Sequence, residues 1–226
     1  MFDQLRNKFL SRRALNAYTA GDYQTALTLF KELRDKSPSQ AGHGHNIALC
    51  YLGMGMYEEA EPLLLQELEQ FGDHFPRIRA LGDLYYAWGK REKAGEYYRR
   101  AIEDSPEEEG VRQLELRIQI CGSEDGFARA QEAAARYQEG NELLASDKPD
   151  EALDAFSEAV QLDPSNVQAM NNYATMLMNH RKDVDQAVSY FEKALALHNI
   201  PAIRLNIQRA AEFQAEQEKK RKKGRN

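Results

Sequence analysis

Three glycines recur in this chain at a constant interval, because Gly21, Gly55 and Gly89 are each 34 residues apart. An alanine follows each glycine at the same position of the period. A fixed period of this length is typical of helical repeat arrays, in which one repeat cannot bury its apolar face alone. The chain is therefore expected to fold as a stack of similar helical units.

The stretch 81–106, LGDLYYAWGKREKAGEYYRRAIEDSP, is the clearest single repeat. Its apolar residues have helical spacing on both sides of Gly89, which indicates two short amphipathic helices joined by a turn. Small residues stand where two helices would cross closely (Gly82, Ala94, Ala101), and large ones fill the space beside them (Leu81, Tyr85, Tyr98). The order L-G-x2-Y…A-x3-Y…P resembles the pattern of tetratricopeptide repeats. This resemblance implies an all-α fold, a right-handed α-solenoid of stacked helix-turn-helix repeats with a C-terminal capping helix.

The register breaks after the third repeat. Ala152 occupies the alanine position of a later repeat, but it lies 58 residues after Ala94 instead of 34. We interpret the intervening segment as a degenerate repeat with an alanine-rich second helix, since alanine favours helix formation. This helix, expected from about Phe127 to Ala145, runs into the first helix of the next repeat through Gly140.

A one-residue insertion marks the last repeat. Ala187 lies 35 residues after Ala152, so the turn NHRKDVD is expected to carry one extra residue. The equivalent alanines are predicted to lock the helix pairs together, and they are Ala26, Ala60, Ala94, Ala152 and Ala187. The predicted repeat domain covers residues 1–217 and precedes a basic tail, 218–226. Its parts are repeats at about 7–39, 41–73 and 75–107, a degenerate repeat at 108–135, repeats at 133–165 and 167–200, and a cap at 201–217.

Three serines suggest where helices begin. Ser37, Ser105 and Ser165 are each followed three residues later by glutamine or glutamate, as in a capping box. We therefore expect a helix to start directly after each of these serines.

Charge is unevenly distributed along the chain. The net charge is −6, yet the last nine residues hold six bases and one acid, which leaves 24 bases against 35 acids in the rest. An acidic body argues against nucleic-acid binding there, because phosphate neutralisation needs a basic face. Nucleic-acid binding by the tail stays open.

The sequence favours a reducing compartment. Cys50 and Cys121 fall inside helical apolar patterns, which indicates packed, reduced thiols and not a disulfide framework. No apolar run approaches the roughly 18–20 residues of a membrane span. The N-terminus also lacks the apolar core and cleavage site of a signal peptide. We expect a cytoplasmic protein, or one on the cytoplasmic side of a membrane.

Catalytic motifs are missing from the sequence. It contains neither a G-x-S-x-G elbow nor a G-x-x-x-x-G-K-[ST] phosphate loop, and neither cysteine has an obvious histidine partner. His43, His45 and His74 lack cysteines or carboxylates at ligand spacing. The sequence therefore predicts a protein that is not an enzyme and has no cofactor and no metal site.

The resemblance places the candidate binding residues on the first helix of each repeat. In tetratricopeptide proteins these helices line a concave groove that holds an extended peptide or a partner's helix. Asparagine amides suit a peptide backbone, tyrosines give rigid contact area, and arginines hold carboxylates. The predicted groove residues are Tyr18, Asn46, Leu49, Arg79, Asp83, Tyr86, Arg117, Tyr137, Asn141, Asn171, Asn172 and Thr175. The predicted function is a non-catalytic scaffold or adaptor for a protein or peptide partner, with self-association through its ends as a further option.

One subfamily offers a more specific comparison. Chaperone-binding tetratricopeptide domains hold a C-terminal carboxylate with two lysines, an arginine and two asparagines on successive first helices. Asn141 and Asn172 match the two asparagines, but Tyr137 stands where the first lysine is expected, and the second lysine is also missing. Only the uncharged half of the clamp is present, which argues against chaperone-tail binding of that kind.

The two ends of the chain support an alternative function, a peripheral membrane- or RNA-associated protein. At the N-terminus, apolar residues (Met1, Phe2, Leu5, Phe9, Leu10) stand beside bases (Arg6, Lys8, Arg12, Arg13). Such a helix suits a membrane surface, although we favour the simpler interpretation that it packs on the first repeat as a cap. The basic tail is either a solvated extension or a site for anionic lipid, RNA or an acidic partner.

Overall fold

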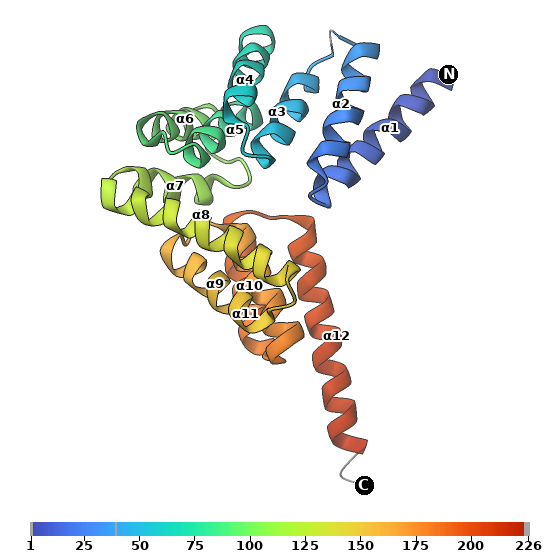
Figure 1. Ribbon diagram of the computed structural model, residues 1–226, viewed down its shortest axis with the longest axis vertical. Coiled ribbons are helices and arrows are strands. Elements are labelled where there is room, and N and C mark those ends of the chain that lie inside the picture. Colours follow the sequence, from blue (N-terminus) through green and yellow to red (C-terminus); the bar gives the residue numbers. More distant parts are fainter. Residues whose placement is uncertain (1, 39, 224–226) are drawn as a thin grey trace. The chain divides into compact units, whose positions relative to one another are not determined.

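A computed structural model of the protein describes residues 2–38 and 40–223, with side chains described for 6–38 and 40–215. Over these residues the chain forms twelve α-helices and one π-helical turn, without a strand (Figure 1). The prediction of an all-α repeat fold is confirmed. The chain divides into two compact units, Met1–Pro106 (unit 1) and Glu107–Asn226 (unit 2). A single repeat domain over 1–217 stays a prediction.

Unit 1 consists of three consecutive helix pairs. Within each pair the two helices pack on one another, and the second helices of the first two pairs also pack on the first helix of the pair that follows. The bounds are α1 (Phe2–Thr19), α2 (Tyr23–Lys36), α3 (His43–Gly53), α4 (Tyr57–Phe71), α5 (Phe75–Ala87) and α6 (Arg91–Asp104). These pairs coincide with the predicted repeats 7–39, 41–73 and 75–107.

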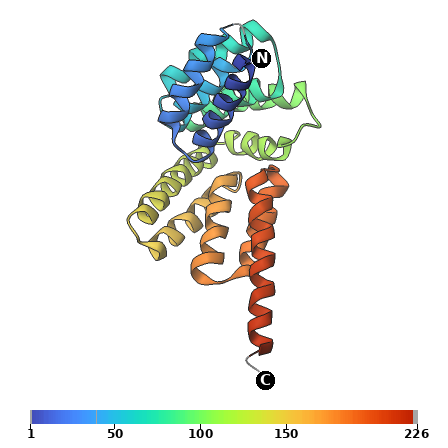
Figure 2. The same cartoon turned by 90° about the vertical axis from the view of Figure 1, so that its right-hand side faces the viewer.

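Unit 2 begins with the degenerate repeat. The 22-residue helix α8 is continuous and serves both this repeat and the next one, as the sequence predicted. Beside the helices α10 and α11 lies α12, the predicted cap (Figure 2). The bounds are α7 (Val111–Cys121), α8 (Glu124–Ala145), α9 (Pro149–Leu162), α10 (Val167–Met176), the π-helical turn η1 (Leu177–Arg181), α11 (Val184–Leu197) and α12 (Pro201–Lys223).

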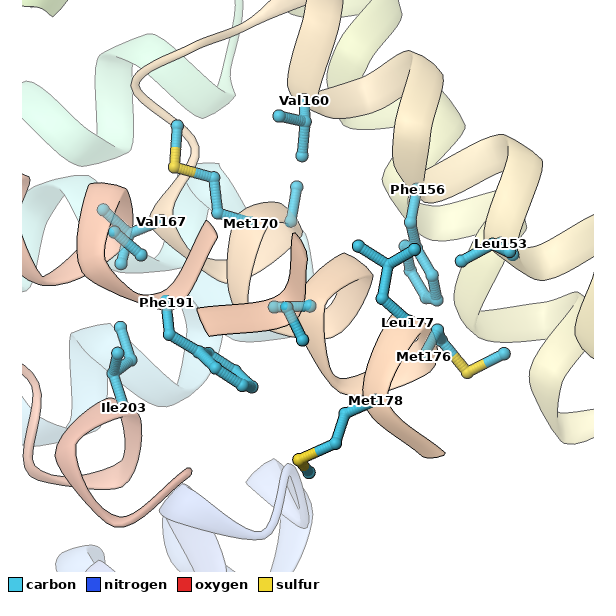
Figure 3. Close-up of a cluster of buried hydrophobic side chains, with 14 of the residues drawn as sticks. Leu153, Phe156, Val160, Val167, Met170, Met176, Leu177, Met178, Phe191 and Ile203 are labelled. Carbon is cyan, nitrogen blue, oxygen red and sulfur yellow. The ribbon is translucent and has the colours of Figure 1, made fainter. Parts of the chain in front are cut away.

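The core of unit 2 is built around two phenylalanines from second helices. Phe156 of α9 and Phe191 of α11 are both fully buried (Figure 3). Leu177 and Ile203 pack into the same cluster, so the π-helical turn and the cap both contribute to this core.

The predicted alanine contacts are confirmed. Ala26, Ala60, Ala94, Ala152 and Ala187 all have 0% of their surface exposed. Two glycines allow a similarly close approach: an added Cβ would lie 2.5 Å from Tyr98 Cδ1 at Gly82 and 2.7 Å from Phe156 Cε1 at Gly140.

In the five helix pairs that contain one of these alanines, the turn has a left-handed residue five positions before the alanine. Glycine occupies it in the three repeats of unit 1, whereas unit 2 has Asp147 (φ 58°) and Lys182 (φ 60°). Because the spacing from Lys182 to Ala187 is unchanged, the extra residue of the last repeat does not lie within that interval. It is instead accommodated by the π-helical turn Leu177–Arg181, a correction to the predicted longer turn.

The capping-box prediction was wrong. The helices α3 and α7 begin several residues later than expected, after Gly42 (φ 91°) and Gly110 (φ 94°). Ser37 and Ser105 instead follow the ends of α2 and α6 as C-caps. These helices start where glycine allows a positive φ, so serine spacing alone was misleading. The helix α10 starts after Asn166, whose side chain accepts a hydrogen bond from the Ala169 amide.

The ends of the chain follow the predictions in part. Leu10 and Ala14 of α1 are buried in the core of unit 1, as expected of a helix that packs on the first repeat, whereas 69% of the Phe9 surface is exposed. At the other end, the backbone stays helical through Lys223. The side chains of the predicted basic tail lie outside the described residues.

Candidate functional site

Five side chains from three first helices of unit 2 form a continuous hydrogen-bonded row. Asn172 Nδ2 of α10 donates to Asn141 Oδ1 of α8 over 3.2 Å and to the Tyr137 hydroxyl over 3.4 Å. On the other side, Asn171 Nδ2 donates to Asn172 Oδ1 over 3.4 Å. Asn206 Nδ2 of α12 donates to Asn171 Oδ1 over 2.9 Å. We call Tyr137, Asn141, Asn171, Asn172 and Asn206 the amide row.

The row has a single hydrogen-bond direction. It begins at Arg209, whose Nη1 donates to Asn206 Oδ1 over 3.5 Å, and ends at Asn141. Hydrogen bonds in series polarise one another, which favours one ordered arrangement. Within the described residues Asn141 Nδ2 donates to no acceptor, so its N–H groups are available to an oxygen of a ligand. All five members of the row are half-buried.

Helical spacing places the amides of α10 on one side of that helix. Val167, Met170 and Ala174 are buried, and they share one face because they lie three and four residues apart. Asn171 therefore flanks the buried face, and Thr175 lies one turn beyond it. The Thr175 hydroxyl donates to the Asn171 backbone carbonyl over 2.7 Å. The pattern that buries α10 thus leaves these polar groups accessible at its edge.

Unit 1 carries a different, charged set. Arg79 Nε lies 3.5 Å from Asp83 Oδ2, one turn apart on α5. The fully buried Tyr98 of α6 donates its hydroxyl proton to Asp83 Oδ1 over 2.9 Å. This hydrogen bond from a buried group fixes the position of the Asp83 carboxylate.

The other predicted residues of unit 1 differ in how deeply they are buried. Tyr86 is only 7% exposed, and its ring lies 6.0 Å from that of Tyr98, so most of it belongs to the core. Asn46 and Leu49 of α3 are half-buried. Burial raises the pKa of Tyr18 to about 12, and the charges of nearby groups, Asp83 among them, act in the same direction. Tyr18 therefore stays a neutral hydrogen-bonding group at physiological pH.

Arg117 has a contact that its position in the sequence did not reveal. Its Nε donates to Ser165 Oγ over 3.4 Å, and Gln113 of the same helix donates to the Ser165 carbonyl over 2.8 Å. Ser165 in turn donates its hydroxyl proton to Asp163 Oδ1 over 2.6 Å. These bonds tie α7 to the loop between α9 and α10, so Arg117 has a structural contact within unit 2.

The twelve predicted residues therefore fall into two sets of six, one in each unit. The structure joins Tyr137, Asn141, Asn171 and Asn172 directly, and it pairs Arg79 with Asp83. Sequence reasoning missed Asn206, which was assigned to the cap. The sequence does contain a clue to it. The helix α12 stands where the first helix of a further repeat would be, and Asn206 lies on it at a position that faces the asparagines of α10.

The described residues were predicted to contain neither a metal site nor a membrane span, and the structure bears on both points. The described residues contain no group of three or more His, Cys, Asp or Glu side chains arranged to hold a metal ion. Burial lowers the pKa of His43 and of His45, and one ring nitrogen of each is buried without a hydrogen-bond partner. Among the described helices, none combines the length and apolar character needed to span a membrane.

Several solved structures resemble this chain at low sequence identity. They include TTC0263, a tetratricopeptide repeat protein of Thermus thermophilus, with 16% identity, a TM-score of 0.47, and coverage of 91% of this chain and 98% of that one. The yeast Sti1 TPR2AB domain in complex with pHSP90 has 18% identity, a TM-score of 0.47, and coverage of 86% and 78%. YrrB, described as having an unusual peptide-binding site, has 16% identity, a TM-score of 0.43, and coverage of 88% and 90%. No curated protein sequence matches the chain.

Family models give the assignment. Three models described as tetratricopeptide repeat match residues 17–84, 80–107 and 137–199, which together make up more than half of the chain. The matched segments contain α2 to α6 of unit 1 and α9 to α11 of unit 2, but only the last residues of α1 and the C-terminal part of α8. The chain belongs to the tetratricopeptide repeat family.

Proposed function

We propose that this protein is a non-catalytic interaction scaffold that binds a segment of a partner protein along its first helices. The observation that carries the proposal is the amide row, which crosses three helices of unit 2 while its members stay half-buried. Neutral amides offer both donors and acceptors, and a peptide backbone presents the complementary groups at every residue. The family assignment supports the same function.

The partner is expected to be a peptide segment and not an isolated anion. The amide row itself contains no formal charge, and at its Asn141 end Tyr137 stands in place of a lysine. In unit 1 the Arg79 cation is offset by Asp83 over 3.5 Å. Recognition in both units therefore depends on directed hydrogen bonds and tyrosine contacts more than on net charge.

Partner capture with matched variants tests the proposal. Wild type and an Asn141→Ala, Asn172→Ala double variant are crosslinked in native lysate, and captured proteins are identified by mass spectrometry. The control is a Gln138→Ala, Gln161→Ala double variant, because these exposed amides of the same unit bond only within their own helices. We expect the row variant to lose specific partners that the control retains. An identical partner set for all three proteins contradicts binding at the row.

The set in unit 1 is tested separately with Arg79→Ala. If the partner also contacts α5, this variant loses part of the capture while its helix content stays unchanged by circular dichroism. Unchanged capture would restrict the binding surface to unit 2.

Phe9 gives a specific reason to keep the alternative function. Its exposed ring stands beside Arg12 and Arg13 on α1, the combination found on helices that bind anionic surfaces. Co-sedimentation with phosphatidylserine vesicles, and separately with RNA, tests recruitment, using wild type, Phe9→Ser and a chain truncated after residue 217. Salt-sensitive binding that these changes weaken supports recruitment. Absence of binding by the intact chain ends this alternative.

A further inference from the structure

A pocket of about 380 Å³ lies in unit 2 between the end of α10, with its π-helical turn, and α12. Thr175 and Asn206 on its wall connect it to the amide row, because Asn206 belongs to the row and Thr175 bonds to the Asn171 carbonyl. Met178 and Phe213 supply its apolar surface. None of these contacts was expected from the sequence, which assigned α12 to the cap.

The inserted residue of the last repeat shapes this pocket. Met178 and Asn179 line it from the π-helical turn, which accommodates the insertion. Figure 3 shows that the side chains of Met176 and Met178 point to different sides of their segment. π-Helical turns are rare and often occur at functional sites. The pocket is therefore a particular feature of this repeat and does not follow from the 34-residue pattern.

The lining offers an uncharged occupant one apolar patch, formed by Met178 and Phe213. Met178 and Phe213 form an apolar wall, and a thioether adapts well to varied side-chain shapes. Arg209 and Glu212 stand at the exposed rim with opposite charges, so neither sign of ligand charge is favoured overall. The remaining lining residues, Thr175, Asn179 and Asn206, are polar, so the pocket combines one apolar patch with hydrogen-bonding groups.

The neighbouring amide row favours an extended peptide over a helix. The backbone N–H and C=O groups of a helix are already paired with each other, whereas an extended segment presents them to its surroundings. Asn206 and Thr175 place such polar contacts directly beside the pocket. A segment lying along the row would therefore reach the pocket with a side chain.

We propose that this pocket holds one apolar side chain, of leucine, methionine or phenylalanine, from an extended peptide whose backbone pairs with the amide row. The proposal rests on the proposed function and adds a sequence preference to it. It also gives α12 a role in recognition in addition to covering the last repeat.

The probe is a displayed library of random linear dodecapeptides, selected on the full-length protein. Selected peptides are synthesised, and their affinities for wild type and two threonine variants are measured by calorimetry. Thr175→Phe fills the pocket from its wall. Thr28→Phe is the matched control, because Thr28 makes the same bond to the carbonyl four residues earlier but lies exposed on α2, away from the pocket residues. Circular dichroism establishes that each variant is folded.

We expect the selected peptides to share one apolar position. Alanine at that position and the Thr175→Phe variant should each weaken binding at least tenfold, roughly the effect of losing an interface anchor. Thr28→Phe should leave binding unchanged. Met178→Ala enlarges the pocket and should shift selection toward larger aromatic anchors, which decides the matter if Thr175→Phe does not fold.

Three results would overturn the proposal in distinguishable ways. Peptides that bind Thr175→Phe as tightly as wild type exclude the pocket but leave the scaffold function intact. A shared charged residue in place of the apolar one excludes the assigned chemistry. If wild type selects no peptide, both the pocket proposal and peptide binding by the scaffold fail.

Discussion

Gly82 lies directly beneath the ring of Tyr98, so close that an added Cβ would be 2.5 Å from Tyr98 Cδ1. Unit 2 repeats this relationship, with Gly140 beneath Phe156 at 2.7 Å. In both cases the glycine and the aromatic residue are 16 positions apart, on the first and second helix of one pair. In both of these helix pairs a small residue on the first helix makes room for a large ring on the second.

Gly82→Ala is expected to destabilise the protein by about 1–3 kcal/mol, because the methyl group overpacks a closed contact. Alanine has a higher helix propensity than glycine, so an effect of helix propensity alone would stabilise the protein. Urea unfolding followed by circular dichroism measures the change. In the background of Tyr98→Leu, which removes the ring, the cost should shrink. An equal cost in both backgrounds would show that the contact is not the cause.

Ala94→Leu should cost a similar amount, about 1–3 kcal/mol, since Ala94 is completely buried between helices. Ala135→Leu is the matched control, because Ala135 is exposed on α8 and its replacement should change stability by no more than about 0.5 kcal/mol. Both variants are compared by urea unfolding. Equal effects would mean that the buried alanine contact does not limit the packing of the pair.

The fold could be predicted from the sequence wherever the backbone geometry permits only one or two residue types. A close helix crossing needs alanine or glycine, and a left-handed turn usually takes glycine, so Ala26 and Gly21 mark the first repeat plainly. Asp147 and Lys182 occupy the same left-handed position without glycine, so the glycine period does not mark those two turns. The start of α3 was also hidden, because the carboxylate of Glu67 caps it from another helix.

Asp147→Gly should stabilise the protein by about 0.5–1 kcal/mol, because glycine adopts a φ of 58° without the steric cost of a side chain. The reverse type of substitution, Gly55→Ala at a φ of 73°, should destabilise the protein by about 1 kcal/mol. Thermal unfolding of both variants beside wild type gives the two signs. A loss of stability in Asp147→Gly would mean that the aspartate side chain contributes more to the turn than the backbone strain costs.

The candidate site was predictable only in part. Asparagines at equivalent positions of successive first helices placed Asn141 and Asn172 together, and the structure joins them. The contact of Arg117 with Ser165 spans 48 residues and depends on a loop conformation that no local pattern encodes. Asn206 was missed because its helix, α12, was interpreted as a cap and not as the first helix of a repeat. The pocket beside it depends on a π-helical turn, which sequence periodicity showed only as one extra residue.

Glu67→Ala should destabilise the protein by about 1–3 kcal/mol. The Glu67 carboxylate accepts hydrogen bonds from the Gly42 amide over 3.0 Å and from the Gly44 amide over 2.8 Å, and the side chain is buried. Removing it leaves two amides at the start of α3 without this acceptor. Glu67→Gln keeps one acceptor oxygen and should recover part of the loss. Amide hydrogen exchange should quicken at Gly42 and Gly44 in Glu67→Ala, and unchanged exchange there would contradict the capping role.

Stability in acid should depend on the bond between Tyr85 and Glu61. Tyr85 is almost fully buried and donates its hydroxyl proton to Glu61 Oε1 over 2.6 Å, which lowers the pKa of Glu61 below its ordinary value of 4.5. Because the folded state holds this carboxylate ionised, its contribution is fully present above pH 4.5 and is lost as the pH falls through the lowered pKa.

Tyr85→Phe removes the donor while keeping the ring, and at pH 7 it should cost about 1–3 kcal/mol. Protonation of Glu61 weakens the same bond in wild type, so the stability difference between the two proteins should narrow as the pH falls below 4.5. Urea unfolding of both proteins between pH 7 and pH 3 measures this difference. A gap that stays constant or widens in acid would show that the Tyr85 hydroxyl contributes independently of the ionised Glu61 carboxylate.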